Sequence, residues 1–180
     1  MNEAESKAKT VGLRQTGTLS CGELAECPGV PSNERLRRGP VAVIECYEEI
    51  PCNPCESNCP RGAICVGDAI TNRPCLDAGA CIGCAICIAR CPGLAIFVVD
   101  RSQEDGDYVS LPYELLPLPK VGDEMSGIDR SGEPICVVEV VTVNTRSAND
   151  RTAVVTVRVP KSRGMDVRFL RPEGEAGNAF

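Results

Sequence analysis

The residues Cys81-Ile-Gly-Cys84-Ala-Ile-Cys87-Ile-Ala-Arg-Cys91-Pro92 decide the fold of the central part of this chain. They follow the pattern C-x2-C-x2-C-x3-C-P, and an Ala-Ile pair ending at Ile96 comes soon after them. A second copy lies 32 residues earlier, as Cys52-Asn-Pro-Cys55-Glu-Ser-Asn-Cys59-Pro60, and an Ala-Ile pair ending at Ile64 follows it in the same way. The first copy keeps the last three cysteines and the proline of the second, so the chain carries an internal duplication.

This cysteine spacing fits iron–sulfur chemistry. Three cysteines that follow one another at x2 spacing let a loop curl around one cluster, and the fourth cysteine begins a short helix that points toward the other cluster. Thiolates are soft, anionic donors that suit iron, and the proline after the fourth cysteine fixes the exit of the chain. Two zinc sites with four cysteines each are the alternative. Zinc sites usually show two separated CxxC pairs, however, so the spacing favours iron–sulfur clusters.

On these motifs, residues 44–100 resemble a bacterial-type dicluster ferredoxin domain. The resemblance implies a βαββαβ core with pseudo-twofold symmetry and two [4Fe-4S] clusters. It also implies that the fourth cysteine of each copy binds the cluster of the other copy. The ligands expected for cluster A are Cys59, Cys81, Cys84 and Cys87, and those expected for cluster B include Cys52, Cys55 and Cys91.

The first copy departs from the family pattern at position 49, where a glutamate stands in place of the expected cysteine. A carboxylate is a hard donor and a poor match for a thiolate position, so we expect Glu49 to be the weaker candidate. Cys46, three residues earlier, leaves a longer loop that can still close one corner, and we expect it to be the fourth ligand of cluster B. Cys27, in the segment Cys27-Pro-Gly-Val-Pro31, is an alternative. A three-cysteine cluster that readily loses one iron is another.

The other cysteines, Cys21, Cys65, Cys75 and Cys136, are expected to be small buried hydrophobic residues, because free cysteine is among the most buried residue types. The basic residues Arg35, Arg37 and Arg38 are expected to form a solvated face or to contact an acidic partner.

Composition and net charge exclude several classes of functional site and partner. The chain has 180 residues, 13 cysteines and no histidine, which excludes a Ser-His-Asp triad, histidine-ligated zinc and a Rieske centre. A net charge of −6 argues against nucleic-acid binding and suits docking on a basic patch of a protein partner. No apolar stretch approaches the roughly 20 residues that cross a bilayer, and residues 1–20 contain no secretory signal. We therefore expect a cytoplasmic protein, where clustered cysteines usually bind metal.

Four regions are expected in an α+β fold. An extended N-terminal arm, 1–43, has little regular structure beyond one short helix, and its first dozen residues are expected to be disordered. The dicluster domain occupies 44–100. Strand-forming runs of β-branched residues then predict a small barrel-like module of about five strands over 107–172, and a flexible tail, 173–180, follows. Three prolines within 111–120 predict an extended edge segment.

The whole chain also resembles ferredoxin-like electron-transfer subunits associated with anaerobic flavin-dependent amino- or imino-acid dehydrogenases. This second resemblance is carried by residues 27–31, 39–46 and 49–55, and residues 116–121 and 154–159 add to it. It implies a non-catalytic electron carrier in a hetero-oligomer with FAD- or FMN-containing subunits, or with a soluble redox partner. A cluster-based redox or oxygen sensor is the alternative function. Neither reading involves nucleic acid or membrane insertion.

Overall fold

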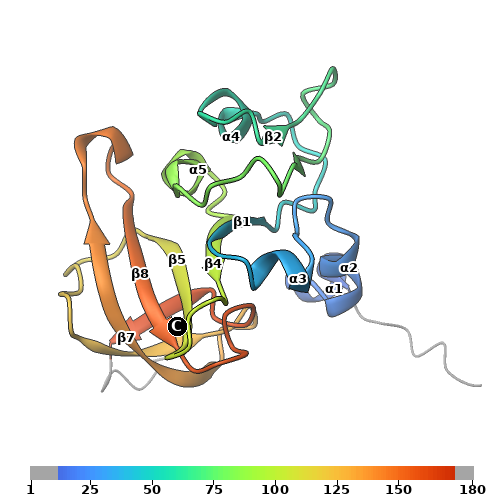
Figure 1. Ribbon diagram of the computed structural model, residues 1–180. Coiled ribbons are helices and arrows are strands. Elements are labelled where there is room, and N and C mark those ends of the chain that lie inside the picture. Colours follow the sequence, from blue (N-terminus) through green and yellow to red (C-terminus); the bar gives the residue numbers. More distant parts are fainter. Residues whose placement is uncertain (1–11, 173–180) are drawn as a thin grey trace, which may run out of the picture.

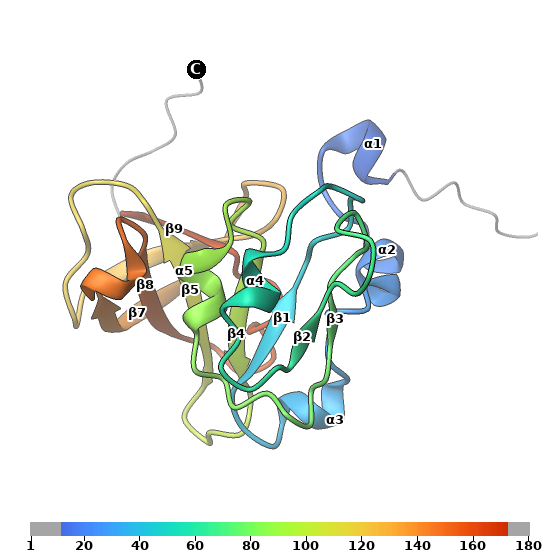
Figure 2. The same cartoon turned by 90° about the horizontal axis from the view of Figure 1, so that it is seen from above.

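Strand β1 (Val41–Ile44) precedes the first cysteine repeat and pairs antiparallel with β4 (Ile96–Asp100), which follows the second repeat. Between them lie α4 (Pro54–Ser57), β2 (Ile64–Cys65), β3 (Cys75–Leu76) and α5 (Ile86–Arg90). The elements of this region therefore follow one another in the order β-α-β-β-α-β, with β2 paired to β3 in a separate two-stranded sheet. Figures 1 and 2 show α4 and α5 on one side of the β1–β4 pair.

The computed structural model describes residues 12–172 and is a mixed α/β structure with few, short helices. Its main sheet has seven antiparallel strands in the order β1-β4-β5-β8-β7-β6-β9. Residues 1–11 and 173–180, where disorder and a flexible tail were expected, lie outside the described residues.

Strands β1 and β4 are buried on both faces. Along β1, Val41 and Val43 pack into the core of the C-terminal strands, whereas Ala42 and Ile44 pack with buried cysteines and Ile88. Alternate residues of a strand point to opposite faces, so each strand serves two cores. This explains why both strands are continuous apolar runs instead of alternating ones.

The C-terminal region contains five strands, and their buried side chains form most of an apolar core to which β1 and β4 also contribute. They are β5 (Asp107–Tyr113), β6 (Glu124–Ile128), β7 (Pro134–Asn144), β8 (Ala153–Val159) and β9 (Phe169–Pro172). The five strands curl, since Tyr113 at the end of β5 and Phe169 at the start of β9 stack with ring centroids 6.0 Å apart. Strand β4 pairs with β5, so one sheet runs through both regions. Pro112 is tolerated in β5 because the pairing with β4 ends at Ser110, which leaves an open edge beyond it.

The N-terminal arm is more helical than we expected. It forms α1 (Leu13–Thr16), α2 (Cys21–Glu26) and α3 (Asn33–Leu36). A capping box starts α2: the Ser20 hydroxyl accepts from the backbone N–H of Glu23, and the Glu23 carboxylate accepts from the Ser20 N–H. Ser32 caps α3 through one bond, in which its hydroxyl accepts from the backbone N–H of Arg35 at 3.2 Å. These caps satisfy backbone donors that short helices otherwise leave unpaired.

Candidate functional site

Four cysteines from both repeat copies line one cavity of about 220 Å³, which opens beside the end of β1. Three different elements position them. Cys46 follows β1, Cys52 precedes α4 and Cys55 lies within it, and Cys91 is the C-cap of α5. Helix α4 can begin where it does because Pro54 occupies its first turn, where no backbone donor is needed. We refer to these residues as set B: Cys46, Cys52, Cys55 and Cys91.

The thiols of set B lie close enough to affect one another electrostatically. Burial raises the pKa of Cys55 to about 11, and the negative charges of the other three members raise it as well. Burial also raises the pKa of Cys46, followed by the charges of Cys91 and Cys52. The backbone N–H of Ala95 donates to Cys91 Sγ at 3.4 Å. Burial and mutual repulsion both oppose the ionisation of these thiols. A bound cation offsets this cost and stabilises the thiolate form.

Four other cysteines form a second group around α5. Burial raises the pKa of Cys87 to about 12, and the charges of Cys81, Cys84 and Cys59 add to this effect. Three members come from the second repeat copy and one from the first. We refer to these residues as set A: Cys59, Cys81, Cys84 and Cys87.

Backbone donors also reach the sulfurs of set A. The N–H of Ala63 donates to Cys59 Sγ at 3.2 Å, and the N–H of Ala42 donates to Cys81 Sγ at 3.4 Å. Hydrogen bonds to ligand sulfurs are one of the means by which a protein sets the potential of a metal centre.

The loop before α5 is shaped by backbone conformations that few residues adopt. Gly83 has φ +66, and a Cβ there would lie 2.6 Å from Pro40 Cβ, so only glycine fits. Ala85, the N-cap of α5, also has a positive φ of 63. The helix that follows carries Cys87 of set A and has Cys91 of set B as its C-cap, and so connects the two sets.

The alternative ligands for the fourth position lie elsewhere. Cys27 is buried, and its pKa is raised by burial and then by the charge of Glu45, but it does not line the cavity of set B. Glu49 is exposed and lines a different cavity together with Arg73. Of the three candidates for the fourth position, Cys46 alone lines the cavity of set B.

The expectation for two of the remaining cysteines was wrong. Cys65 and Cys75 are exposed, because β2 and β3 form a sheet of only two strands with one face open to solvent. Cys136 on β7 is partly buried. The side chain of Cys21 lies outside the described part of the structure.

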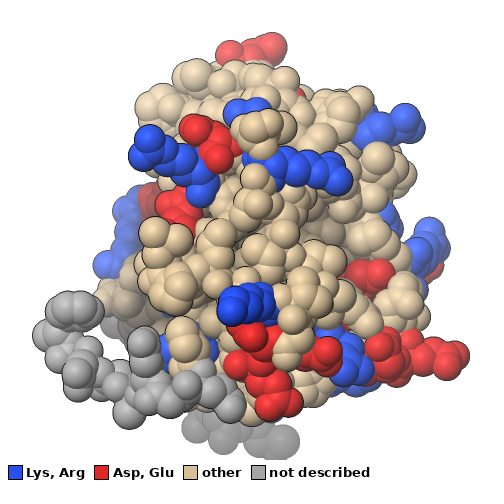
Figure 3. Space-filling view, turned by 90° about the vertical axis from the view of Figure 1, so that its left-hand side faces the viewer, with Lys and Arg blue, Asp and Glu red and all other residues tan. Residues whose placement is uncertain are grey.

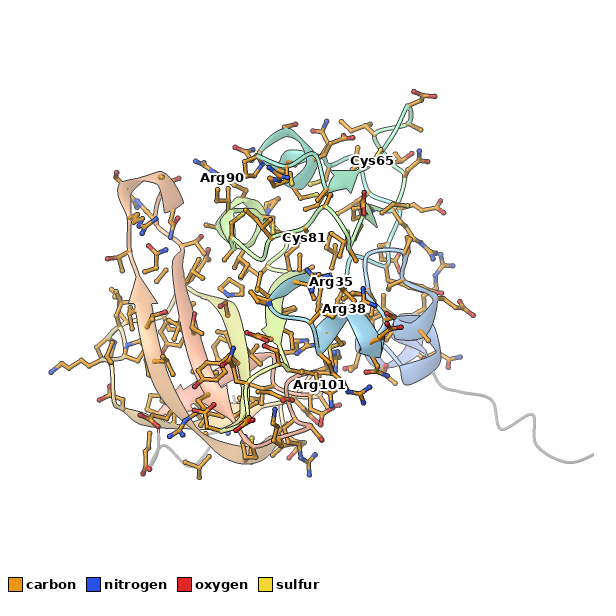
Figure 4. All side chains as sticks on the ribbon, in the orientation of Figure 1. Arg35, Arg38, Cys65, Cys81, Arg90 and Arg101 are labelled. Atoms are coloured by element: carbon orange, nitrogen blue, oxygen red, sulfur yellow. The ribbon has the colours of Figure 1, made fainter. Side chains whose placement is uncertain are left out.

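Sequence reasoning missed the role of Arg35. We expected a solvated residue or one that contacts an acidic partner, but its guanidinium is half-buried and lies beside Cys81 (Figure 4). It donates to four backbone carbonyls, those of Ala78 at 2.6 Å, Cys81 at 2.9 Å, Gly39 at 3.0 Å and Pro40 at 3.2 Å. The planar fork of arginine suits such multiple contacts. The only signal in the sequence is a basic residue in a helix close to a cysteine-rich loop.

An ion-pair network beside Cys46 was also missed. The Glu45 carboxylate accepts from Arg168 Nε and from Arg130 Nε, both at 2.8 Å. Arg168 also donates to the carbonyls of Gly164 and Val167, and its guanidinium lies 4.7 Å from the centre of the Phe97 ring. These contacts tie the residue before Cys46 to the C-terminal strands. The partners are more than 80 positions apart, so no local pattern points to them.

Among residues 12–172, no three Cys, Asp or Glu side chains converge tightly enough to hold one shared ion. No helix within the same residues is long and apolar enough to cross a membrane. Comparison of the chain with protein-family models, with curated proteins and with solved structures finds no match.

Proposed function

We propose that this protein is a non-catalytic electron carrier that holds two [4Fe-4S] clusters, cluster A on set A and cluster B on set B. The observation that carries the proposal is the crossed grouping of the cysteines. Cys59 of the first repeat copy groups with three cysteines of the second, and Cys91 of the second groups with cysteines of the first. Such crossing is what paired clusters require of this spacing. The β-α-β-β-α-β order of residues 41–100 supports the same dicluster ferredoxin assignment.

The donor sets fit the proposed clusters chemically. Each set contains four thiols, the number that holds one [4Fe-4S] cluster, and the four ligands of such a cluster bind separate iron atoms. When bound, each cluster gains and releases one electron. Cys55 and Cys87, with pKa values of about 11 and about 12, are protonated at neutral pH in the metal-free chain. Cluster assembly must therefore displace their protons, and a chain without cations keeps these ligands as neutral thiols.

Protein residues lie between the two proposed centres and exclude water from them. Cys87 and Cys91 are separated by about one turn of α5, so only a short stretch of protein lies between the two ligand sets. Ile44, Ile88 and Ile96 are buried beside the cysteines and exclude water from them. Burial and solvent exclusion are levers on the potential of an iron–sulfur centre.

Electron exchange needs an accessible edge, and set A has one. Cys84 is exposed, and the neighbouring side chains of Ile82 and Ile86 are 57% and 42% exposed. We place the docking of the electron-transfer partner at this apolar edge. The partner in our proposal is an FAD- or FMN-containing oxidoreductase subunit in a hetero-oligomer, or else a soluble redox protein.

The C-terminal strands present a different kind of surface. On the side that lies at the left in Figure 1, basic and acidic side chains surround an uncharged centre, and acidic ones gather along the lower edge in Figure 3. Such a mixed surface suits contact with another subunit of the proposed complex.

The test is anaerobic purification with any bound partner, followed by iron, sulfide and flavin analysis. We expect about eight irons and about eight sulfides per chain and reversible bleaching by dithionite. Cys84→Ser and Cys52→Ser should each reduce the iron content by removing a ligand of a different cluster. Cys136→Ser, which changes a cysteine of β7 outside both sets, is the matched control. Stoichiometric zinc, or iron that does not change with either ligand variant, would contradict the proposal.

A further inference from the structure

Cys65 and Cys75 belong to neither cysteine set, and they lie directly opposite each other in the β2–β3 pair. The N–H of Asp77 donates to the carbonyl of Ala63 at 2.8 Å, so these two residues form a hydrogen-bonded pair. Hydrogen-bonded and non-hydrogen-bonded pairs alternate along an antiparallel ladder, so the two cysteines also occupy a hydrogen-bonded position. Opposite Cα atoms at such a position are about 5.5 Å apart. This separation lies within the range of about 4.4–6.8 Å that a disulfide bridges.

The two thiols also share an open face. Their neighbours in the ladder, Ile64 and Leu76, turn to the opposite face, where Ile64 is buried and Leu76 is partly buried. Cys65 and Cys75 are exposed, and Figure 4 shows Cys65 on the two-stranded sheet, on the far side of Cys81 from Arg35. Small solutes can therefore reach both sulfurs, and the two side chains stand side by side on this face.

The hairpin that carries this pair is hydrogen-bonded to both cysteine sets. Just before β2, the N–H of Ala63 donates to Cys59 Sγ of set A at 3.2 Å. In the connection between the strands, the carbonyl of Ile70 accepts from the N–H of Cys52 of set B at 3.1 Å. A covalent link between the strands would hold both of these contacts in place.

We propose that Cys65 and Cys75 form a reversible disulfide that clamps the β2–β3 hairpin, and that a low-molecular-weight disulfide, RSSR, is the oxidant. One cysteine thiolate attacks RSSR, forming a mixed disulfide and releasing one RS group as a thiol. The second cysteine then attacks the mixed disulfide and releases the other RS group. Two cysteine thiols are oxidised to one disulfide, RSSR is reduced to two RSH, and the two cysteine protons end on the two RSH molecules. The proposal does not depend on the identity of the metal bound by sets A and B.

The experiment uses the full-length protein, purified anaerobically and equilibrated with glutathione buffers of increasing oxidised fraction. Acid quenching and alkylation precede digestion after Arg61 and before Asp68 and Asp77. This digestion places the two cysteines on separate peptides, residues 62–67 and residues 68–76. We expect a disulfide-linked pair of these peptides to rise from background to most of the protein as the oxidised fraction increases, and to disappear when a reductant is added.

Variants give the matched controls. Cys65→Ser and Cys75→Ser should each abolish the linked pair and leave the iron content unchanged, whereas Cys136→Ser should leave the linked pair intact. The wild-type measurement decides the question even if a variant folds poorly. Separately alkylated peptides at every buffer ratio, or a link from either thiol to another cysteine, would overturn the proposal. A linked pair in a protein that contains no iron would uphold this inference and contradict the cluster proposal, so the two failures are distinguishable.

Discussion

Replacing Glu45 by glutamine removes a buried negative charge and leaves the size of the side chain unchanged. The Glu45 side chain is 6% exposed, and its partners Arg168 and Arg130 are 5% and 18% exposed. Burial raises the pKa of Glu45, but the hydrogen bonds and charges of the two arginines outweigh it and hold the pKa below its usual range. Burial lowers the pKa of Arg168 to about 10, and the charge of Glu45 opposes that change. The variant therefore leaves a buried guanidinium without its counter-ion.

Breaking one side of a buried ion pair costs about 3–5 kcal/mol of unfolding free energy. We expect the lower value, about 3 kcal/mol, because the carbonyls of Gly164 and Val167 still accept from Arg168. For a chain of this size each kcal/mol shifts the melting temperature by about 2–4 °C, so the loss corresponds to about 6–12 °C.

Anaerobic thermal unfolding of the full-length protein measures this loss, with the iron content determined on the same samples. Glu34→Gln is the matched control, because Glu34 forms an exposed ion pair with Arg38, in which the side chains are 75% and 68% exposed. Exposed pairs of this kind contribute little, and we expect no measurable change. Equal melting temperatures for the two variants would refute the reasoning from burial.

Three further predictions concern the two sets and the N-terminal arm. Arg35→Lys loses the planar fork that reaches four carbonyls, so a chelator should remove iron from it faster than from Arg38→Lys, and equal rates would show that Arg35 does not position set A. Cys46→Ser should lose iron or alter one EPR signal, whereas Cys27→Ser should not, and the reverse result would assign the fourth position to Cys27. The pKa of Glu23 is lowered by hydrogen bonds from the N-cap of α2. The ionised Glu23 carboxylate stabilises the N-cap fully above the ordinary carboxyl pKa, and this stabilisation is lost as the pH falls through the lowered pKa. The difference in N-cap amide exchange between wild type and Glu23→Gln should therefore vanish in acid. A difference that persists there would show that the carboxylate charge is not its cause.

Local patterns predicted several elements of the structure. The β-branched runs became β7 and β8 within a group of five strands, and the order of elements around the cysteines follows from the duplication and its flanking apolar segments. The crossed cysteine grouping was implied by the family resemblance, and the fourth position was open between Cys46, Cys27 and Glu49. Only the three-dimensional path of the chain could place these three residues relative to the cavity of set B.

Other features depend on contacts that no local pattern encodes. The arm was expected to hold one short helix and forms three in its described part; its Gly and Pro content argues against helices, whereas the Ser20 and Glu23 pair matches the pattern of a capping box. The exposure of Cys65 could not be predicted, because a two-residue strand does not indicate whether a further strand or helix covers it. The network of Glu45 joins residues from distant parts of the chain, and its partners become visible only when β1 lies against the C-terminal strands.

Strands β1 and β4 pack one face into the cysteine-rich core and the other into the C-terminal core, so neither half of the chain has a complete core without the other. A chain cut between residues 100 and 107 would leave β4 with an unpaired edge and an uncovered apolar face, a combination that favours aggregation. Unfolding should therefore be cooperative across the whole described chain. In the complex that we propose, loss of a cluster would therefore loosen the surface that the C-terminal strands offer to a partner, and a bound partner would in turn slow the release of iron.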